Sequence, residues 1–303
     1  MDNPKTHGPP WIRPDIQQQI DWRDRDIVIS VPPKSGTTWT MNIVYQLLQG
    51  GKRDFQDIYA EVPWIEFLAH PEQTVQDILD RVEAMPVGIP RAFKTHSAPP
   101  GIPYLQPTSD RNVRYLVIAR NPEEAMVSFK PFIEKHTDEW FELWQVPKQA
   151  MTRQTFPGFY REVLDGAMGM QGMFFQFISA WWPLRHAPNV LLLHYTEMKK
   201  DHGGSLRRIA EFLELEPSAD QWPVIEELTG FNWMKQNTEK FEMSALPGVP
   251  ILQRGAMIRK GQAGSAREDG MTSEIAAHIR AIGEQLCTDQ YALNWLYEGG
   301  DYS

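Results

Sequence analysis

The chain has 303 residues, a hydrophobic content of 42% and a charged content of 23%, which is the balance of an ordinary globular protein. A formal net charge of -9 argues against non-specific nucleic-acid binding, and no apolar stretch reaches the ~20 residues that a membrane-spanning helix needs. We therefore expect one domain over residues 1–303, with a loosely ordered segment at residues 1–20 and no membrane insertion. A lone cysteine, Cys287, cannot form an internal disulfide, which favours a reducing, cytoplasmic location.

The first predicted element is a short buried strand at residues 27–31, followed at once by the sequence PKSGTTW at residues 33–39. A helical pattern comes next and ends at Gly50 and Gly51. A glycine-containing loop that leads into a helix directs main-chain N–H groups at one point, where the helix dipole favours an anion. The residues that would hold a nucleotide phosphate and base are Lys34, Ser35, Gly36, Thr37, Thr38 and Trp39.

This loop differs from the usual nucleoside-triphosphate loop, in which the lysine follows the glycine in the pattern G-x-x-x-x-G-K-[ST]. Here Lys34 precedes Gly36, and the usual pattern occurs nowhere in the chain. The alternative interpretation is a helix start whose Ser and Thr side chains cap the free N–H groups of the first turn. Lys34, Gly36 and Trp39 together favour anion binding.

Three further strands are predicted at residues 91–95, 113–119 and 189–195, the first of them the weakest. Helical patterns lie at residues 122–132, 172–185, 205–215 and 221–228. Strands that alternate with helices predict an α/β fold, with a central parallel β-sheet flanked by helices on both faces. Ligands of such sheets bind at the carboxyl ends of the strands, where the loop at residues 33–39 would lie.

PKSGTTW resembles the 5′-phosphosulfate-binding loop of the cytosolic-type sulfotransferases, and other motifs of that family follow in family order. These enzymes transfer a sulfuryl group from 3′-phosphoadenosine 5′-phosphosulfate (PAPS) to an acceptor hydroxyl or amine and release PAP. The matching segments are RAFKTH at 91–96, YLVIARNPEEAMVSFKPF at 115–132, HYTEMKKD at 194–201, TGFNWMKQN at 229–237 and RKGQAG at 259–264. The resemblance covers about residues 26–264.

The resemblance implies a role for individual residues. His96 matches the catalytic histidine, Lys94 is its companion, and Lys34 would act at the leaving phosphate. An imidazole titrates near neutral pH, which suits a general base. The further cofactor-binding residues that it implies are Arg120, Ser128, Tyr195, Thr229, Phe231, Arg259, Lys260 and Gly261.

An acceptor pocket is expected beside these residues. The segment VPWIEF at residues 62–67 resembles an acceptor-side loop of the family. Its aromatic residues and those of the segment around Ser128 suggest an apolar pocket next to His96. The candidate acceptor-binding residues are Trp64, Phe67, Phe129, Phe132 and His96.

The chain also departs from the family pattern. Ser265, Ala266 and Arg267 follow Gly264, where the family has Asp-Trp-Lys, and the short dimerisation signature is not evident. The oligomeric state is therefore left open, and residues 134–169 match no pattern of the family.

The sequence thus predicts a PAPS-dependent sulfotransferase that acts on a hydroxyl of a small, largely apolar acceptor, such as a phenol, a steroid or another alcohol. The transfer would be in line, with His96 as general base and without a metal. A nucleotide-dependent kinase of related fold and a catalytically silent PAPS- or PAP-binding protein remain as alternatives. The missing G-K-[ST] sequence argues against a kinase, and the presence of both His96 and Lys94 argues against a silent binding protein.

Overall fold

The computed structural model describes residues 9–108, 110–261 and 264–302. Within this part of the chain, four parallel strands form the central sheet in the order β2-β1-β3-β4. The strands are β1 (Ile27–Ser30), β2 (Ala92–Thr95), β3 (Arg114–Ala119) and β4 (Val190–His194). Nearly every strand residue is buried, so the sheet must be covered on both faces. The predicted parallel sheet is confirmed, including its weakest strand.

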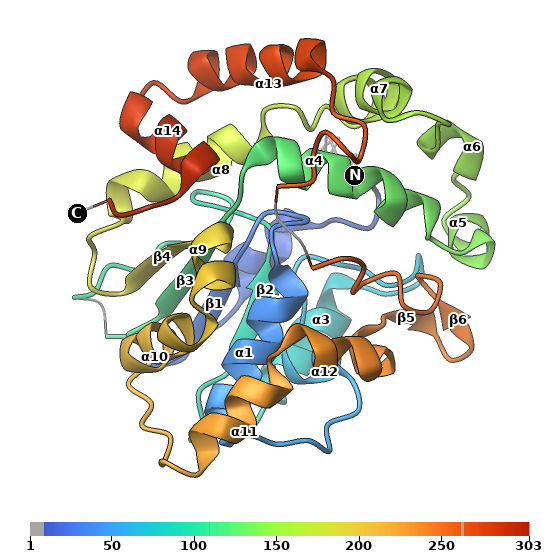
Figure 1. Ribbon diagram of the computed structural model, residues 1–303. Coiled ribbons are helices and arrows are strands. Elements are labelled where there is room, and N and C mark those ends of the chain that lie inside the picture. The colour runs from blue at the N-terminus through green and yellow to red at the C-terminus, as the bar shows by residue number, and fades with distance from the viewer. Residues whose placement is uncertain (1–8, 109, 262–263, 303) are drawn as a thin grey trace.

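Helices cover the sheet on both sides (Figure 1). Helix α1 (Thr37–Gln49) packs against β1 and β2, whereas α8 (Met173–Trp181) packs against β3. Two C-terminal helices that we did not predict, α13 (Ser273–Leu286) and α14 (Gln290–Glu298), lie against α8. Figure 1 shows these three helices gathered on one side of the sheet, with α1 and α11 on the other.

The remaining elements are mostly short. Helix α11 (Gln221–Leu228) has the predicted bounds, and α10 (His202–Phe212) begins three residues early because Asp201 caps it. The others are α2 (Ile58–Glu61), α3 (Val75–Glu83), α4 (Pro122–Glu134), α5 (Asp138–Leu143), α6 (Lys148–Met151), α7 (Phe156–Phe159), α9 (Tyr195–Lys200), α12 (Phe231–Gln236), β5 (Ser244–Leu246) and β6 (Val249–Pro250).

The N-terminal segment is more ordered than predicted. Residues 1–8 lie outside the described residues, but Pro14–Gln19 forms a 3-10 helix in which Ile16 and Gln17 are fully buried. The Gln17 amide donates to Ser97 (2.7 Å) and accepts from the Thr95 hydroxyl (2.8 Å). The prediction of loose order is therefore wrong for this part, because Ile16 belongs to the core and Gln17 bonds to the end of β2.

A buried ion pair joins the starts of two neighbouring strands. Arg91 precedes β2 and donates to both carboxylate oxygens of Asp26, which precedes β1, at 2.9 and 2.6 Å. Both side chains are 1% exposed, and Arg91 also donates to two main-chain carbonyl oxygens. Removing one partner from such a pair leaves an uncompensated buried charge, at a cost of about 3–5 kcal/mol.

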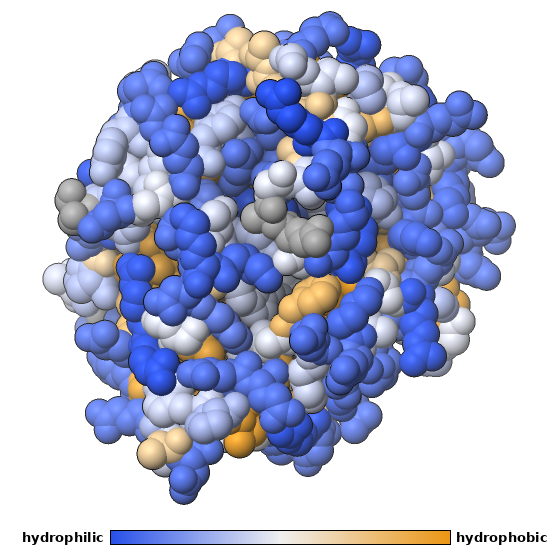
Figure 2. Space-filling model, in the orientation of Figure 1, coloured by the Kyte–Doolittle hydropathy of each residue, from blue (hydrophilic) through white to orange (hydrophobic). Residues whose placement is uncertain are grey.

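The face seen in Figure 2 is covered mostly by hydrophilic residues, and hydrophobic residues appear on it in small, separate groups. None of the described helices is both long enough and apolar enough to span a lipid bilayer.

Candidate active site

A cavity of about 770 Å³ opens where the four strands end. Because the strands are parallel, the residues that follow them meet at one edge of the sheet: the loop after β1, His96 after β2, Arg120 after β3 and Tyr195 after β4. Every candidate site residue of the sequence analysis borders this cavity except Ser35. The Ser35 side chain is fully buried, its N–H donates to Pro32, and its hydroxyl has no partner among the described residues, so its contact with the cofactor stays a prediction.

The loop after β1 leaves the start of helix α1 uncapped. No side chain of the described residues accepts from the first turn of α1, and the buried Thr37 hydroxyl has no partner among them. The next strand–helix connection differs, because Asn121 caps α4 by accepting from the main-chain N–H groups of Glu123 and Glu124. The interpretation of the loop as a self-capped helix start is therefore wrong, and free donors remain for an anion.

The backbone of this loop has little room to vary. Lys34 and Gly36 both have positive φ angles, of 64° and 94°. A Cβ atom on Gly36 would lie 2.8 Å from the ring of Tyr195, so glycine is required on both counts. Burial and the neighbouring charges of Arg120 and Arg259 lower the pKa of Lys34 to about 7. An incoming phosphate would stabilise the charged ammonium.

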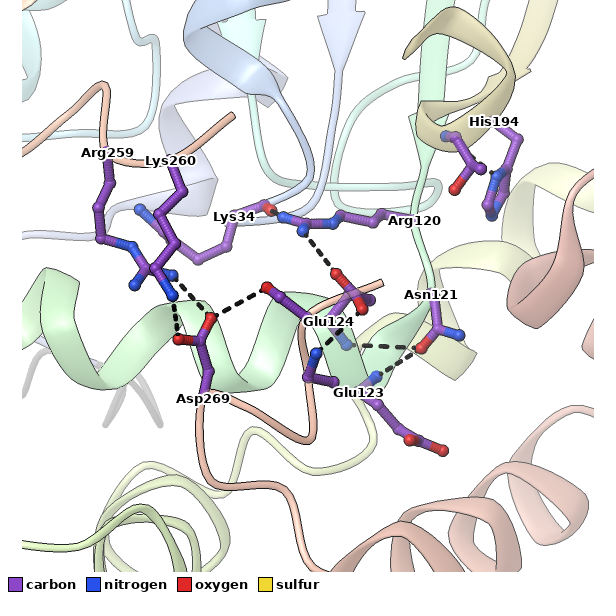
Figure 3. A network of polar contacts seen from close by, with 12 residues as sticks. Lys34, Arg120, Asn121, Glu123, Glu124, His194, Arg259, Lys260 and Asp269 are labelled. Atoms are coloured by element: carbon purple, nitrogen blue, oxygen red, sulfur yellow. Dashed lines mark hydrogen bonds and ion pairs between the residues drawn. The ribbon is translucent and has the colours of Figure 1, made fainter. Parts of the chain in front are cut away.

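A cluster of cations lies beside the loop, and each cation already has an acidic neighbour (Figure 3). Arg120 donates to the Lys34 carbonyl oxygen (2.8 Å) and pairs with Glu124 (3.0 Å). Arg259 and Lys260 both pair with Asp269, at 3.2 and 2.6 Å. Burial alone would raise the pKa of Asp269, but the hydrogen bonds from Lys260, Arg259 and Ser265 and the charge of Arg259 together lower it. The predicted 3′-phosphate residues are therefore brought together.

Two aromatic residues, Trp39 and Phe231, also line the cavity. The Trp39 indole N–H donates to the Thr229 carbonyl oxygen at 2.8 Å, which fixes the ring. A Cβ atom on Gly261 would lie 2.4 Å from the Phe231 ring, so the main chain at Gly261 packs against this ring at a distance that leaves no room for a side chain. Lys199 also borders the cavity, with its ammonium 5.7 and 5.9 Å from the centroids of the Trp39 and Phe231 rings.

His96 has a defined tautomer. Its Nδ1 lies 2.6 Å from the Val31 carbonyl oxygen, which can only accept, so Nδ1 carries the proton. Among the described residues no group donates to Nε2, and the side chain borders the cavity. Burial, together with the charges of Lys94 and Lys34, holds the pKa of His96 well below its usual value. The ring is neutral near pH 7, with a free lone pair on Nε2.

A buried carboxylate, Glu66, holds the strand end that carries His96. Its Oε1 accepts from the main-chain N–H of His96 (2.6 Å) and shares the single Thr95 hydroxyl proton (2.9 Å) with the Gln17 amide oxygen. Burial raises the pKa of Glu66 and lowers the pKa of Lys94, whose ammonium lies 3.0 Å from the centroid of the Trp64 ring. The sequence analysis missed Glu66, although its single charge within the apolar segment 62–67 was a visible signal.

The acceptor side of the cavity is aromatic. Phe67 stacks on Trp64 with centroids 4.4 Å apart, and the His96 ring lies edge-on to Trp64 at 4.8 Å. Phe132 lies under the Lys34 ammonium at 3.9 Å, and Phe129 is buried beside it on α4. Several lining residues were not foreseen, since they come from segments without a recognisable motif: Tyr59, His136, Trp140, Met151, Met168, Met170, Met173, Met243 and Met257.

No group of three metal-ligating side chains (His, Cys, Asp or Glu) occurs in residues 9–108, 110–261 and 264–302. The donor set of the cavity is instead that of an organic anion: ammonium, guanidinium and main-chain N–H groups. These residues fit a nucleotide with two separate phosphate-type groups, because the uncapped helix and the Arg120–Arg259–Lys260 cluster are distinct cationic sites.

Comparisons with known proteins agree with this geometry. The sulfotransferase domain model matches residues 24–290. Sulfotransferase 1A1 of Rattus norvegicus is 32% identical over 73% of this chain and 70% of its own length, and sulfotransferase 1E1 of Mus musculus is 30% identical over 71% and 68%.

Two solved structures share the fold. Mouse sulfotransferase SULT7A1 complexed with PAP has a TM-score of 0.68 at 20% identity, covering 94% of this chain and 91% of that one. Retinol dehydratase in complex with androsterone and PAP has a TM-score of 0.67 at 21% identity, covering 89% and 83%. With a family model over most of its length and relatives at this identity, the chain belongs to the sulfotransferase family and is a PAPS-dependent enzyme of that family.

Proposed function

We propose that this sulfotransferase transfers the sulfuryl group of PAPS in line to a hydroxyl of a small, largely apolar acceptor, with His96 as general base. The observation that carries the proposal is the His96 ring. Its Nδ1–H is held by the Val31 carbonyl oxygen, which leaves the Nε2 lone pair free, and the side chain borders the cavity beside the Trp64 ring. A base must lie within reach of the proton that it takes, and must be neutral at the working pH.

We assign separate roles in catalysis and cofactor binding to the residues that line the cavity. PAPS, when bound, supplies the sulfuryl group. His96 Nε2 takes the proton of the acceptor hydroxyl, and Lys34 with the free N–H groups of α1 faces the charge that grows on the leaving phosphate. Lys94, whose charge acts on His96, would bind sulfuryl oxygens. Arg120, Arg259 and Lys260 would hold the 3′-phosphate at the other end of the cofactor.

The acceptor class is inferred from the lining of the cavity. Trp64, Phe67, Phe129 and Phe132 form an apolar surface next to His96, and methionines widen it with adaptable side chains. Two solved structures of retinol dehydratase, a protein of the same fold, hold androsterone and retinol, which are apolar molecules with one hydroxyl group. These complexes support a hydroxyl-bearing apolar acceptor for this chain.

The proposal is tested with a panel of phenols, steroids and simple alcohols and a labelled sulfuryl donor, on the wild type and on His96→Ala. We expect turnover of at least one class in the wild type. In His96→Ala we expect kcat to fall by about 10²–10⁴-fold, because a positioned general base is lost. PAP affinity, measured by calorimetry, should stay close to the wild-type value, since His96 faces the acceptor.

Lys34→Ala is the matched comparison, since Lys34 should act on both binding and chemistry. We expect weaker PAP binding and a lower kcat, because its contact with the phosphate strengthens in the transition state. Wild-type kcat in His96→Ala, or a loss of PAP binding equal to that of Lys34→Ala, would remove His96 from the chemistry. PAP binding without turnover of any acceptor would favour the silent-binder alternative.

The cellular location and assembly are also inferred rather than observed. We infer a reducing, cytoplasmic setting from the lone Cys287, which is buried and free. Cell fractionation checks the location, and light scattering measures the oligomeric state.

A further inference from the structure

One polar side chain interrupts the apolar wall on the acceptor side of the cavity. His136 borders the cavity, although only 5% of its surface is exposed. Aromatic rings surround it: Phe132 at 4.8 Å, Trp140 at 4.7 Å and Phe141 at 5.9 Å between centroids. The main chain at His136 also pairs with Leu252. A polar group so enclosed by apolar neighbours needs a partner in any complex that excludes water.

The hydrogen-bonding role of this ring is fixed by its neighbours. His136 Nδ1 lies 3.0 Å from the Phe132 carbonyl oxygen, so it carries the ring proton and donates. Burial lowers the pKa of His136 to about 4, and the ring is therefore neutral near pH 7. Nε2 is left as an acceptor, and no group of the described residues donates to it. Because His136 borders the cavity, this lone pair is open to a molecule bound there.

His136 also lies close to the reaction centre. The Lys34 ammonium is 3.9 Å from the centroid of the Phe132 ring, and the His136 ring stands edge-on to that same ring. One aromatic side chain thus separates the lysine of the phosphate loop from His136. His96 and His136 border the same cavity, so an acceptor of sufficient length can contact both rings.

We propose that His136 selects acceptors that carry, besides the reacting hydroxyl, a second hydrogen-bond donor, either a hydroxyl or an N–H, which donates to Nε2. The proposal rests on the proposed function, because it concerns the acceptor of that reaction. A purely apolar acceptor would displace water from Nε2 without offering a hydrogen-bond donor in its place, which makes its binding free energy less favourable. A molecule with a donor at this point avoids that loss.

The experiment compares matched acceptors. Aromatic and steroidal diols of increasing length are each paired with their monomethyl ether, in which one hydroxyl can no longer donate. In the wild type we expect kcat/KM for the best diol to exceed that of its ether by about tenfold or more. The difference should lie in KM, because the contact exists in both the ground state and the transition state.

Variants assign the preference to the ring. His136→Phe keeps the aromatic shape without an acceptor atom, and we expect the diol preference to fall to near unity. His136→Gln offers an amide oxygen as hydrogen-bond acceptor and should retain part of the diol preference. His278→Phe is the control, since His278 is exposed, contacts Tyr160 and does not border the cavity. PAP affinity should be equal in all of these proteins.

Equal kcat/KM for every diol and its ether in the wild type would overturn the proposal, and this comparison needs no variant to fold. A diol preference that persists in His136→Phe would overturn it as well. In both cases sulfation continues, so the proposed function stands. If no compound is turned over or binds to the PAP-saturated protein, the small-acceptor function fails, and the role of His136 fails with it.

Discussion

The cavity contains two imidazole rings, His96 and His136, that hold their protons in the same way. Each donates through Nδ1 to a main-chain carbonyl oxygen, and each is kept neutral by burial. They differ in their surroundings, because Lys94 and Lys34 lie near His96, whereas aromatic rings enclose His136. The same ring therefore suits proton abstraction at one position and acceptor recognition at the other.

Lys34 leads to a prediction about protons. In the free protein its pKa is about 7, so near pH 8 most molecules carry a neutral amine there. A bound phosphate stabilises the ammonium and raises that pKa, and PAP binding at pH 8 should then take up about one proton. The phosphates cannot obscure this, because their second pKa of about 6 leaves them without a proton to lose at pH 8. Calorimetry in buffers of different ionisation enthalpy measures the uptake.

The uptake is assigned to Lys34 with a variant. Lys34→Met keeps the length of the side chain without an ionisable group, and its PAP binding should proceed with little proton uptake. The comparison matters because the pKa of Lys94 is also lowered. An equal uptake in Lys34→Met, or none in the wild type, would show that Lys34 is already charged in the free protein.

Single residues were predictable where a motif carried them. Lys34 and Gly36 were predicted because a phosphate requires cations and free N–H groups, and these stand out in a short segment, whereas Arg120 was predicted from the family resemblance. That the Ser35 side chain is buried, unlike those of its neighbours in the loop, could not be predicted, since a sequence does not show which hydroxyl of a loop turns inward. His136 lies in a segment without a motif, so only its place in the fold reveals it.

At the scale of elements, the segment at residues 259–271 carries both the cations of the 3′-phosphate site and a carboxylate against them. Asp269 accepts from Lys260 (2.6 Å), Arg259 (3.2 Å) and the Ser265 hydroxyl (3.2 Å). The Ala266 N–H donates to Glu124, which ties the same segment to α4. These contacts occur where the chain departs from the Asp-Trp-Lys of the family (Figure 3).

We expect Asp269→Asn to strengthen PAP binding. The carboxylate competes with the 3′-phosphate for Arg259 and Lys260, and the amide removes that charge while it keeps the shape. Two partly exposed ion pairs are worth up to about 1 kcal/mol each, so the gain in affinity should be about 3- to 10-fold. Calorimetric titration with PAP measures it, with adenosine 5′-monophosphate as a ligand whose affinity should not change.

Glu268→Gln is the charge-matched control, since Glu268 is the exposed neighbour of Asp269. Its PAP affinity should stay near the wild-type value. Weaker PAP binding in Asp269→Asn would give the opposite conclusion, namely that Asp269 orients the two cations for the phosphate instead of competing with it.

Elements were predictable in proportion to their regularity. The buried strands are continuous apolar runs, and even the weak strand β2 forms, because it pairs with β1 and Arg91 anchors its start to Asp26. Residues 134–169 gave no pattern, because they fold into several short helical pieces. The two C-terminal helices were missed, although α13 is long and capped by Thr272.

At the scale of the whole molecule, the cavity joins segments that lie far apart in the sequence. The phosphate loop, Arg120, Thr229 and the residues 259–261 all border it. The rule that parallel strands end at one edge predicted the meeting of the phosphate loop and Arg120, whereas Thr229 and residues 259–261 follow no strand of this sheet and were predicted from the family resemblance. The acceptor could not be predicted so closely, since the shape of an apolar pocket depends on side chains from many elements.

A ligand that bridges these segments should stabilise the entire fold by mass action. At a concentration 100 times its Kd, PAP adds about 2.7 kcal/mol to the free energy of unfolding, which for a chain of this size raises Tm by about 4 °C. Adenosine 5′-monophosphate and adenosine 3′-monophosphate each fill only one of the two phosphate sites, and at the same concentration they should raise Tm much less. Thermal unfolding followed by circular dichroism measures the three shifts. Equal shifts with PAP and the 5′-monophosphate would mean that Arg120, Arg259 and Lys260 do not hold a 3′-phosphate, and their pairing with Glu124 and Asp269 would then be their native role.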